Sequence, residues 1–318
     1  MFTIRPSTTQ DFPRIVAIIN SQTTEPQTLE DFERGDRNRP ATDIFHRLVA
    51  ESPAGEVIAF GAVNHEGSHH EGEFFIRVRV DAPYQGKGVG TALLERLEQF
   101  TREHGGTKFE TGVREQDTLA VDWCLRKGFK SYNILRESTR TLDDWDPAPF
   151  QEAVARVQAQ GFRFATLAQE MEGQDYMSMM RRYFEALLPM VRDIPGNEDR
   201  PKIPFEEWFT YVKDDPGWKP ERCLLAIDTA TGAWAAISNI YLRSNGALYN
   251  DFTGVARQYR GRGLTLGLKV ESLTLAKRLG GPYIRTNNLA NNPRILAVNQ
   301  RLGYVSAPGH HLLEKQLV

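Results

Sequence analysis

Two stretches of the chain decide its organisation: VDAPYQGKGVG at residues 80–90 and VARQYRGRGLT at residues 255–265. They open an alignment without gaps in which residues 80–129 match residues 255–304 at ten of fifty positions. Ordinary residue frequencies would give about three matches. Many of the shared residues are glycines at turns, where the backbone restricts the choice of residue. The sequence therefore predicts a duplicated domain in which each copy forms its own core.

Each copy shows the same order of predicted elements. A β-rich run leads into the glycine-rich turn, and a helix with apolar residues at helical spacing follows. A Gly-Gly pair ends each helix. A strand, a short helix and a Gly-Phe or Gly-Tyr turn come next. Upstream, each copy has a strand, helices and a hairpin, so the predicted fold class is α/β (α+β).

Composition and charge exclude several classes of protein. The net charge of −2 over 318 residues argues against a broad basic surface for nucleic acid. Cys124 and Cys223 are too few and too far apart for a disulfide framework or a zinc site, and the His69-His70 and His310-His311 pairs have no further ligands nearby. We expect no metal site. We also expect a cytoplasmic protein without a signal peptide, a membrane span or a nucleic-acid partner. The duplication is compatible with a pseudo-symmetric monomer.

Both glycine-rich turns are candidate anion sites. A turn of this kind at a helix N-terminus directs free backbone N–H groups and the positive end of the helix dipole at a ligand. Neither turn has the Gly-Lys-[Ser/Thr] ending of a P-loop. The Rossmann pattern also fails, because Gly90 comes one position too early for its third glycine. Plain turns into helices remain the alternative.

Residues 80–90 resemble the acetyl-CoA signature of the GNAT acetyltransferase superfamily, Gln/Arg-x-x-Gly-x-Gly/Ala. Gln85, Gly88 and Gly90 fill its three defined positions. In the second copy Arg260 and Gly263 match, but Thr265 stands where Gly or Ala is expected. The resemblance covers nearly the whole chain as two tandem domains, similar to the mycothiol-synthase-like architecture. It implies one domain at residues 1–141, a linker with a connecting helix at 142–161 and a second domain at 162–318.

The resemblance also implies a mixed, mostly antiparallel sheet, flanked by helices, that splays open in each domain and holds acetyl-CoA in the split. Main-chain groups of the strand before each turn would pair with the pantetheine arm, and the turn amides would hold the pyrophosphate. The cofactor-binding residues expected in the first copy are Val78, Val80, Gln85, Gly86, Lys87, Gly88, Val89, Gly90 and Thr91. Those expected in the second are Val255, Arg260, Gly261, Arg262, Gly263, Leu264, Thr265, Asn287 and Asn292.

The catalytic groups are less clear from the sequence. Members of the family often use a tyrosine four residues before the Gly-Phe turn to serve the leaving thiolate, but Cys124 and Asn299 stand there. Asn299 can still donate a hydrogen bond, whereas Cys124 is interpreted as a small buried residue. Asp251 is the candidate base or substrate anchor, with Glu73 a weaker candidate in the first copy. We therefore expect the second copy to be catalytic.

The predicted function is an acetyl-CoA-dependent acyltransferase (an N-acetyltransferase of the GNAT type) that moves an acetyl group to an amine of a small molecule. Two alternatives stay open. The acceptor can be a peptide or protein N-terminus, or the chain can be a non-catalytic CoA-binding module. Residues 190–218, rich in proline and aromatic side chains, are the candidate cover of the acceptor site. The sequence does not identify the acceptor.

Overall fold

The computed structural model describes residues 1–23, 25–243 and 245–317. The chain forms two compact units, which are not consecutive segments. The first contains Met1–Tyr132, Pro201–Thr210 and the residues from His311 onward, and the second contains Asn133–Arg200 and Tyr211–His310. The division at residues 141 and 162 therefore stays a prediction.

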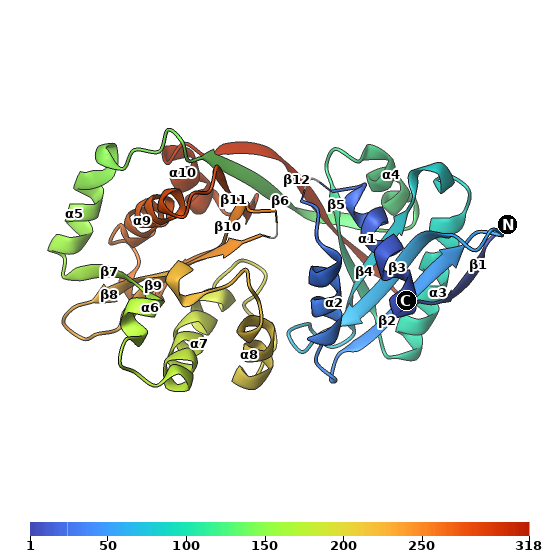
Figure 1. Ribbon diagram of the computed structural model, residues 1–318, viewed down its shortest axis with the longest axis horizontal. Helices are drawn as coiled ribbons and strands as arrows, with labels where there is room; N and C mark the ends of the chain where they lie inside the picture. The colour runs from blue at the N-terminus through green and yellow to red at the C-terminus, as the bar shows by residue number, and fades with distance from the viewer. Residues whose placement is uncertain (24, 244, 318) are drawn as a thin grey trace. The chain divides into compact units, whose positions relative to one another are not determined.

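The first unit consists of a five-stranded array with helices on both faces (Figure 1). Its elements are β1 (Thr3–Pro6), α1 (Phe12–Asn20), α2 (Leu29–Arg37), β2 (Ile44–Glu51), β3 (Val57–His65), β4 (Glu73–Val80), α3 (Val89–Glu103), β5 (Lys108–Arg114) and α4 (Thr118–Arg126). Strands β1 to β4 pair antiparallel in chain order, and β5 joins β4 in parallel. The hairpin predicted around Pro53-Ala54-Gly55 is confirmed as β2 and β3.

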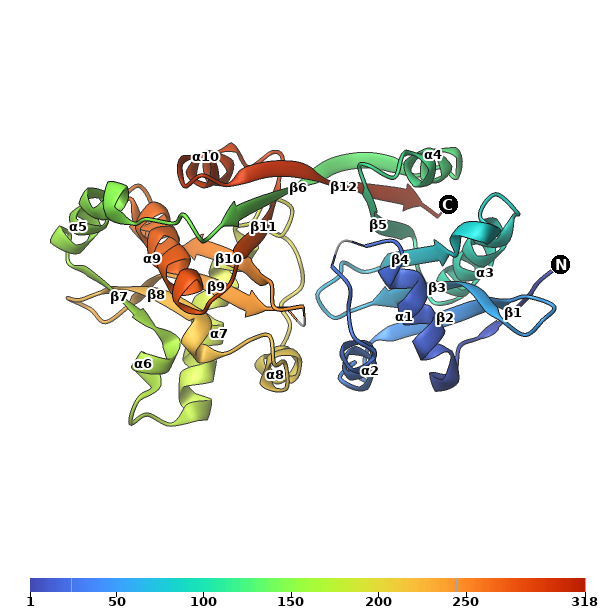
Figure 2. The ribbon, with the colours of Figure 1, turned by 45° about the horizontal axis from the view of Figure 1, so that its top comes forward.

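The second unit repeats this order. Its elements are α5 (Gln151–Ala159), β7 (Phe162–Thr166), α6 (Leu167–Met171), α7 (Tyr176–Arg192), β8 (Cys223–Asp228), β9 (Trp234–Leu242), β10 (Leu248–Val255), α9 (Leu264–Arg278), β11 (Tyr283–Leu289) and α10 (Pro293–Arg301). Strands β7 to β10 pair antiparallel, β11 joins β10 in parallel, and β6 (Lys130–Thr141) pairs antiparallel with β11. Helices α7 and α9 lie on opposite faces of these strands (Figure 2).

Three elements carry residues of both units: β6, α8 (Phe205–Lys213) and β12 (Val305–Gln316). The five short 3-10 turns are Thr9–Asp11, Ala82–Tyr84, Ala148–Phe150, Pro220–Arg222 and Arg257–Tyr259. Since β6 extends the sheet of the second unit, the strand after α4 does not close the first copy as a purely sequential domain would require.

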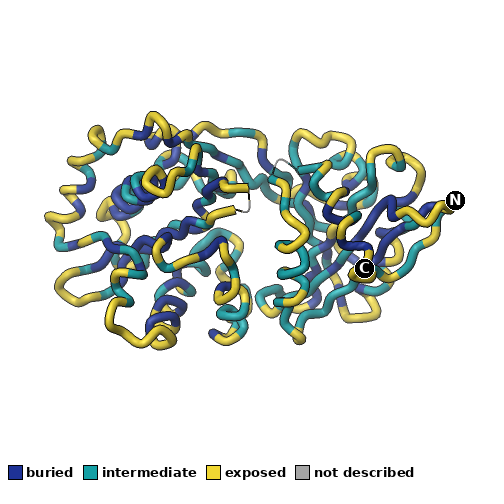
Figure 3. The backbone as a smooth tube through the Cα atoms, viewed as in Figure 1, coloured by how far each residue is buried: buried dark blue, intermediate teal, exposed yellow. Residues whose placement is uncertain are grey.

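Each unit has its own apolar core between its strands and its long helix. In the first, Leu93 and Leu97 of α3 pack on Phe74 and Phe109 of the parallel strand pair. Leu313, near the end of the chain, is fully buried in the same core. In the second, Leu268 and Leu273 of α9 pack with Leu248 and Ile284. Figure 3 shows burial concentrated in the central strands and exposure in the connecting turns.

Candidate functional site

The parallel strand pair of each unit separates after a short stretch, and we call the point of separation the fork. In the first unit β4 pairs with β5 only from Glu73 to Phe75, and the rest of β4 pairs with β3 alone. In the second unit β10 pairs with β11 only at Leu248 and Tyr249. The backbone of both strands beyond the fork is thus left without a partner on one edge. This is the splayed sheet that the sequence predicted.

The two forks differ by one residue. Strand β10 carries a β-bulge between Asn250 and Phe252, so that Asp251 is an extra residue without a cross-strand partner. Strand β4 runs opposite β3 without a bulge. Since Phe74 pairs with Phe109 and Leu248 with Ile284, the counterpart of Ile76 is Asn250. The ungapped alignment had equated Ile76 with Asp251. That equivalence is wrong, and Asp251 has no counterpart in the first unit.

Both glycine-rich turns have the geometry of a ligand cradle. Gly86 and Gly88 have φ of 73° and 84°, and Gly261 and Gly263 have φ of 79° and 81°. L side chains rarely adopt this conformation. A Cβ added at Gly86, Gly88 or Gly261 would meet no protein atom within 4 Å. Gly88 and Gly263 are the N-caps of α3 and α9 and offer no side-chain cap, so the first helical N–H groups are available to an anion.

The side chains around each turn divide into two groups. Those of Gln85 and Lys87, and of Arg260 and Arg262, are exposed. The side chains of Val89 and Leu264, which follow directly, are only 2% and 1% exposed and belong to the two cores. Val89 and Leu264 can therefore serve a ligand only through the main chain. The other expected cofactor residues on these elements, which are Val78, Val80, Gly90, Thr91, Val255 and Thr265, are partly buried.

Gln85 and Arg260 perform the same structural task. Gln85 Nε2 donates to the Val80 carbonyl at 3.0 Å, and Arg260 Nε donates to the Val255 carbonyl at 3.2 Å. Each bond ties the turn back to the last residue of the preceding strand. The first motif residue therefore stabilises the turn, and the main-chain amides remain as the anion-binding groups.

Asp193, just after α7, is a site residue that the sequence analysis missed. Its carboxylate pairs with Arg257 and Arg260, with Arg257 Nε at 2.8 Å. The guanidinium of Arg257, followed by that of Arg260, lowers the pKa of Asp193. Asp193 belongs to the proline-rich segment expected to cover the acceptor site, but nothing in the sequence pairs that segment with the turn.

Three asparagines of the second unit were expected to act in the site. Asn292 caps α10 by accepting from the Ile295 amide at 3.5 Å, and Asp117 caps α4 in the same way. Asn299 is 2% exposed, and its Nδ2 donates to Asn288 Oδ1 at 2.7 Å. Among the described residues, the Oδ1 atoms of Asn287 and Asn299 are buried and have no partner. Buried acceptors of this kind are costly unless a ligand donor satisfies them.

Asp251 combines exposure with a raised pKa. The residue keeps an exposed surface, but the surrounding protein buries most of its carboxyl, and this burial raises the pKa. The positive charge of Arg243 lowers the pKa, and the negative charge of Asp215 raises it. Burial raises the pKa of the Tyr241 phenol, and the negative charges of Asp251 and Asp215 raise it further. An accessible carboxylate with a raised pKa is a suitable proton acceptor. Asp251 therefore remains the candidate base.

The other two candidates do not have this combination. Glu73 is 3% exposed and pairs with Lys108 at 2.5 Å. Burial opposes ionisation, but hydrogen bonds from Lys108 and Glu110 lower the pKa of Glu73 to about 2. Glu73 is thus a buried ion-pair residue and a poor base at neutral pH. Cys124 is 5% exposed, and burial raises the pKa of its thiol to about 11, as expected for a core residue.

Comparisons with known proteins agree with this geometry. Residues 12–129 match the Acetyltransferase (GNAT) family. A tandem GNAT protein from the clavulanic acid biosynthesis pathway aligns over 100% of this chain and 99% of its own, with a TM-score of 0.75 and 16% identity. Residues 12–129 thus carry the sequence pattern of that family, and the whole chain has the fold of a tandem GNAT protein.

Two further solved structures share this tandem fold. A GCN5-related N-acetyltransferase from Sphaerobacter thermophilus aligns over 99% of this chain and 96% of its own, with a TM-score of 0.73 and 20% identity. A glucosamine N-acetyltransferase region of a fungal multi-domain enzyme aligns over 99% of this chain and 38% of its own, with a TM-score of 0.74 and 16% identity. No curated protein sequence matches the chain. These solved structures, at 20% identity or less, show that the chain shares their fold.

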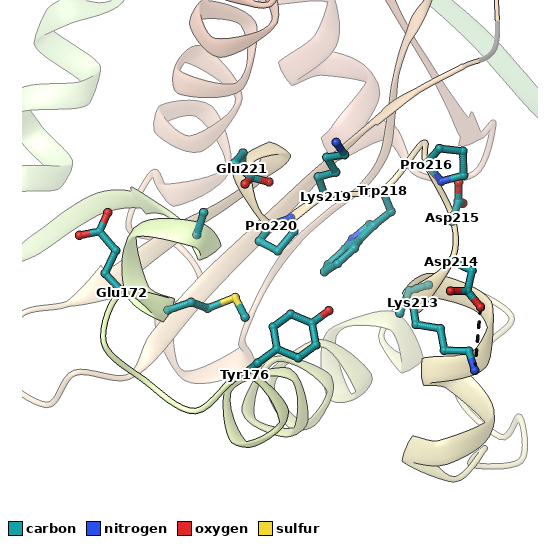
Figure 4. A pocket seen from close by; sticks show the side chains of 13 residues that line it. Glu172, Tyr176, Lys213, Asp214, Asp215, Pro216, Trp218, Lys219, Pro220 and Glu221 are labelled. Atoms are coloured by element: carbon teal, nitrogen blue, oxygen red, sulfur yellow. Dashed lines mark ion pairs between the residues drawn. The ribbon is translucent and has the colours of Figure 1, made fainter.

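A pocket of about 670 Å³ opens in the second unit between α6, the start of α7 and the segment after α8 (Figure 4). The rings of Tyr176 and Trp218 face its interior, and Lys213 and Asp214 form an ion pair at its rim. Asp215 also lines the pocket. Residues 212–218, part of the expected acceptor cover, therefore do line a cavity. Within the described residues, no helix is long and apolar enough to cross a membrane.

Proposed function

We propose that the second unit transfers the acetyl group of acetyl-CoA to the amine of a small molecule, with Asp251 as the base. The observation that carries the proposal is the bulge at the second fork, which adds one exposed carboxylate where the strands separate. The first fork has no bulge and no equivalent acid. Acetyl-CoA supplies the acetyl group as a thioester, and every other task falls to residues of the chain.

The cofactor is held by groups on two sides of the fork. The amides of Gly261 to Thr265 bind the pyrophosphate at the positive end of α9, with Arg262 adding charge. The main chain of Thr253 to Val255, which lacks a partner on one edge, pairs with the pantetheine arm as an added strand would. The buried Oδ1 atoms of Asn287 and Asn299 suit the amide N–H donors of that arm.

The first unit keeps a complete glycine turn and has the same open edge on β4. We propose that Gln85 to Thr91 bind a second CoA there, with Val78 and Val80 as the strand partners. Beyond the fork, β4 carries Arg77 and Arg79 and no acid. Burial by the surrounding protein lowers the pKa of both guanidinium groups, although Arg77 keeps an exposed surface, and neighbouring arginines lower that of Arg77 further. This site binds but does not remove a proton from an amine.

The acceptor is proposed to be a cationic amine in its resting state. Asp251 and Asp215 attract the ammonium form, and Asp251 takes the proton that must leave before the nitrogen attacks the thioester carbonyl carbon. The C–N bond forms as the C–S bond breaks, and the CoA thiolate leaves. The nitrogen loses a second proton as the amide forms, and in the net reaction this proton goes to the thiolate. The pocket that Asp215 lines is of a size typical of small-molecule sites, which supports a small acceptor over a protein terminus.

The direct test combines calorimetry with a screen of acceptors. Acetyl-CoA is titrated into the protein, and release of the CoA thiol is followed with a panel of small amines, amino acids and peptides. Binding with turnover of small cationic amines supports the proposal. Turnover of peptides alone contradicts the proposed acceptor class, and binding without turnover of any amine favours the non-catalytic alternative.

A further inference from the structure

The bulge of β10 is held by one side chain, that of Asn250. This residue is 2% exposed and comes directly before Asp251. Its Nδ2 lies 3.1 Å from the carbonyl of Phe252, on the far side of the bulge, and 2.9 Å from the carbonyl of Asn239 on β9. Its own carbonyl accepts from Thr286 Oγ1 of β11 at 2.9 Å. Asn250 thus links the two ends of the bulge to both neighbouring strands.

Asn250 in turn depends on Lys269 of α9. Lys269 Nζ donates to Asn250 Oδ1 at 2.8 Å, and Thr253 Oγ1 donates to the same atom at 3.1 Å. Lys269 is 1% exposed, and the centroid of the Tyr304 ring lies 5.2 Å from its Nζ. No carboxylate pairs with Lys269 within the described residues. An ammonium in such a place is costly for the fold.

A line of buried hydroxyls completes the contact between α9 and the sheet. Ser272 Oγ donates to Ser238 Oγ at 3.0 Å, and Ser238 Oγ lies 3.1 Å from Asn250 Nδ2. We use the term Asn250 network for this set: Ser238, Asn250, Thr253, Lys269, Ser272 and Thr286. It connects one helix with three strands at the fork. A network in which each member is bonded fixes one arrangement of the backbone.

The first unit shows what the same position looks like without the network. By strand pairing and by the offset of the repeat, Asn250 corresponds to Ile76, Lys269 to Leu94 and Ser272 to Leu97. Ser238 corresponds to Gly61, where an added Cβ would lie 2.7 Å from Leu97 Cδ1. Apolar packing thus replaces the polar network, and there the strand has no bulge. The bulge and the network occur together or not at all.

We propose that Lys269, acting through Asn250, is a positioning residue that keeps the β10 bulge in the shape that holds Asp251 at the fork. This inference rests on the proposed role of Asp251 for its catalytic consequence, but not for its structural part. Its physical basis is that Asn250 Oδ1 is fixed by two donors, so that Nδ2 is directed across the bulge to Phe252. Losing the lysine leaves Thr253 as the one remaining donor to Oδ1 among the described residues, so the amide is held less firmly.

The test compares Lys269→Met with Lys269→Gln, which restores a donor without the charge, and with Leu94→Met as the matched control in the first unit. Hydrogen exchange of the segment 248–255 is measured alongside that of 73–80, which serves as an internal reference. We expect Lys269→Met to exchange faster in segment 248–255 only, and kcat to fall about 10- to 100-fold, as small displacements of a catalytic group do. The KM for acetyl-CoA should stay within about twofold, and Lys269→Gln should recover part of kcat.

Two results separate the inference from the proposed function. Unchanged exchange in segment 248–255 together with wild-type kcat in Lys269→Met overturns the positioning role. Faster exchange in that segment, combined with full activity of Asp251→Asn, supports the positioning of the bulge while contradicting Asp251 as the base. A loss of kcat that Leu94→Met reproduces would also overturn the inference, because the effect would then be one of general packing.

Discussion

The two units share a fold and a glycine turn, yet apolar side chains pack at the first fork and polar side chains at the second. The first fork is packed with Ile76, Leu94 and Leu97, and its strand is regular. The second places Asn250 and Lys269 in the same positions, and its strand bulges at Asp251. Apolar packing at this position suffices for the fold, as the first unit demonstrates. The fold alone therefore does not require polar side chains at the second fork. We attribute them to the exposed carboxylate of Asp251, which lies at the bulge.

The largest effect is expected from removing the carboxylate of Asp251, the group that the second fork has and the first lacks. Asp251→Asn should lower kcat by about 10²- to 10⁴-fold, the usual contribution of a general base. Binding of acetyl-CoA should be unaffected, because Asp251 is not among the groups that hold it. Steady-state kinetics and calorimetry measure the two effects. Activity near that of the wild type would remove the basis for assigning catalysis to the second unit.

The apolar fork can be tested for its dependence on close packing. Gly61→Ala places a Cβ 2.7 Å from Leu97 Cδ1 and should reduce the free energy of unfolding of the first unit by about 1–3 kcal/mol. Gly112→Ala in β5 is the matched control, because a Cβ there meets nothing within 4 Å. Urea denaturation compares the two variants. Equal stability of both would show that α3 can move away from β3 without cost.

The polar fork should carry a stability cost that depends on pH. Burial lowers the pKa of Lys269 from 10.5 to about 7, and no charged partner contributes. Between these values the unfolded state binds more protons than the folded state, so stability should rise with pH across this range, and the full cost is present below pH 7. Lys269→Met should therefore gain most over the wild type at pH 6 and least near pH 10. Thermal melts check this, and a pH-independent difference would contradict it.

The smallest effect expected is a shift in the pH–rate profile. Asp215 raises the pKa of Asp251, and Arg243 lowers it. Asp215→Asn should move the acidic limb of kcat to lower pH, and Arg243→Gln should move it to higher pH. Each variant is the control for the other. General damage to the site would move the acidic limb in the same direction in both variants, or in neither.

The sequence was sufficient for the fold because its signals are local. The repeat, the turn glycines and the apolar periodicity of residues 91–104 each report a neighbouring backbone conformation, and the splayed strands follow from the family resemblance. The ungapped alignment even located the turns to the residue. It failed at Asp251, because the one-residue bulge lies upstream of the aligned block, where residues 73–79 and 248–254 share no identity that could show the shift.

The site was less predictable because its contacts join distant segments. Asp193 reaches Arg257 and Arg260 from the end of another helix, and Lys269 meets Asn250 across the sheet. In the sequence, Lys269 is one of several polar residues of α9 and does not stand out. Only the pairing of strands shows that it faces a second polar residue in the core. Likewise, the parts of β6 and β12 that complete opposite units cannot be read from alternation alone.

The central claim is that the second unit reacts and the first does not, and a pair of turn variants tests it most directly. Gly263→Asp and Gly88→Asp each place a side chain and a negative charge where the pyrophosphate binds, at φ values of 81° and 84° that disfavour a side chain equally. Acetyl transfer from acetyl-CoA to the best amine of the screen is then measured for both. The account predicts that Gly263→Asp abolishes transfer while Gly88→Asp retains it. Retained transfer in Gly263→Asp with loss in Gly88→Asp would contradict it.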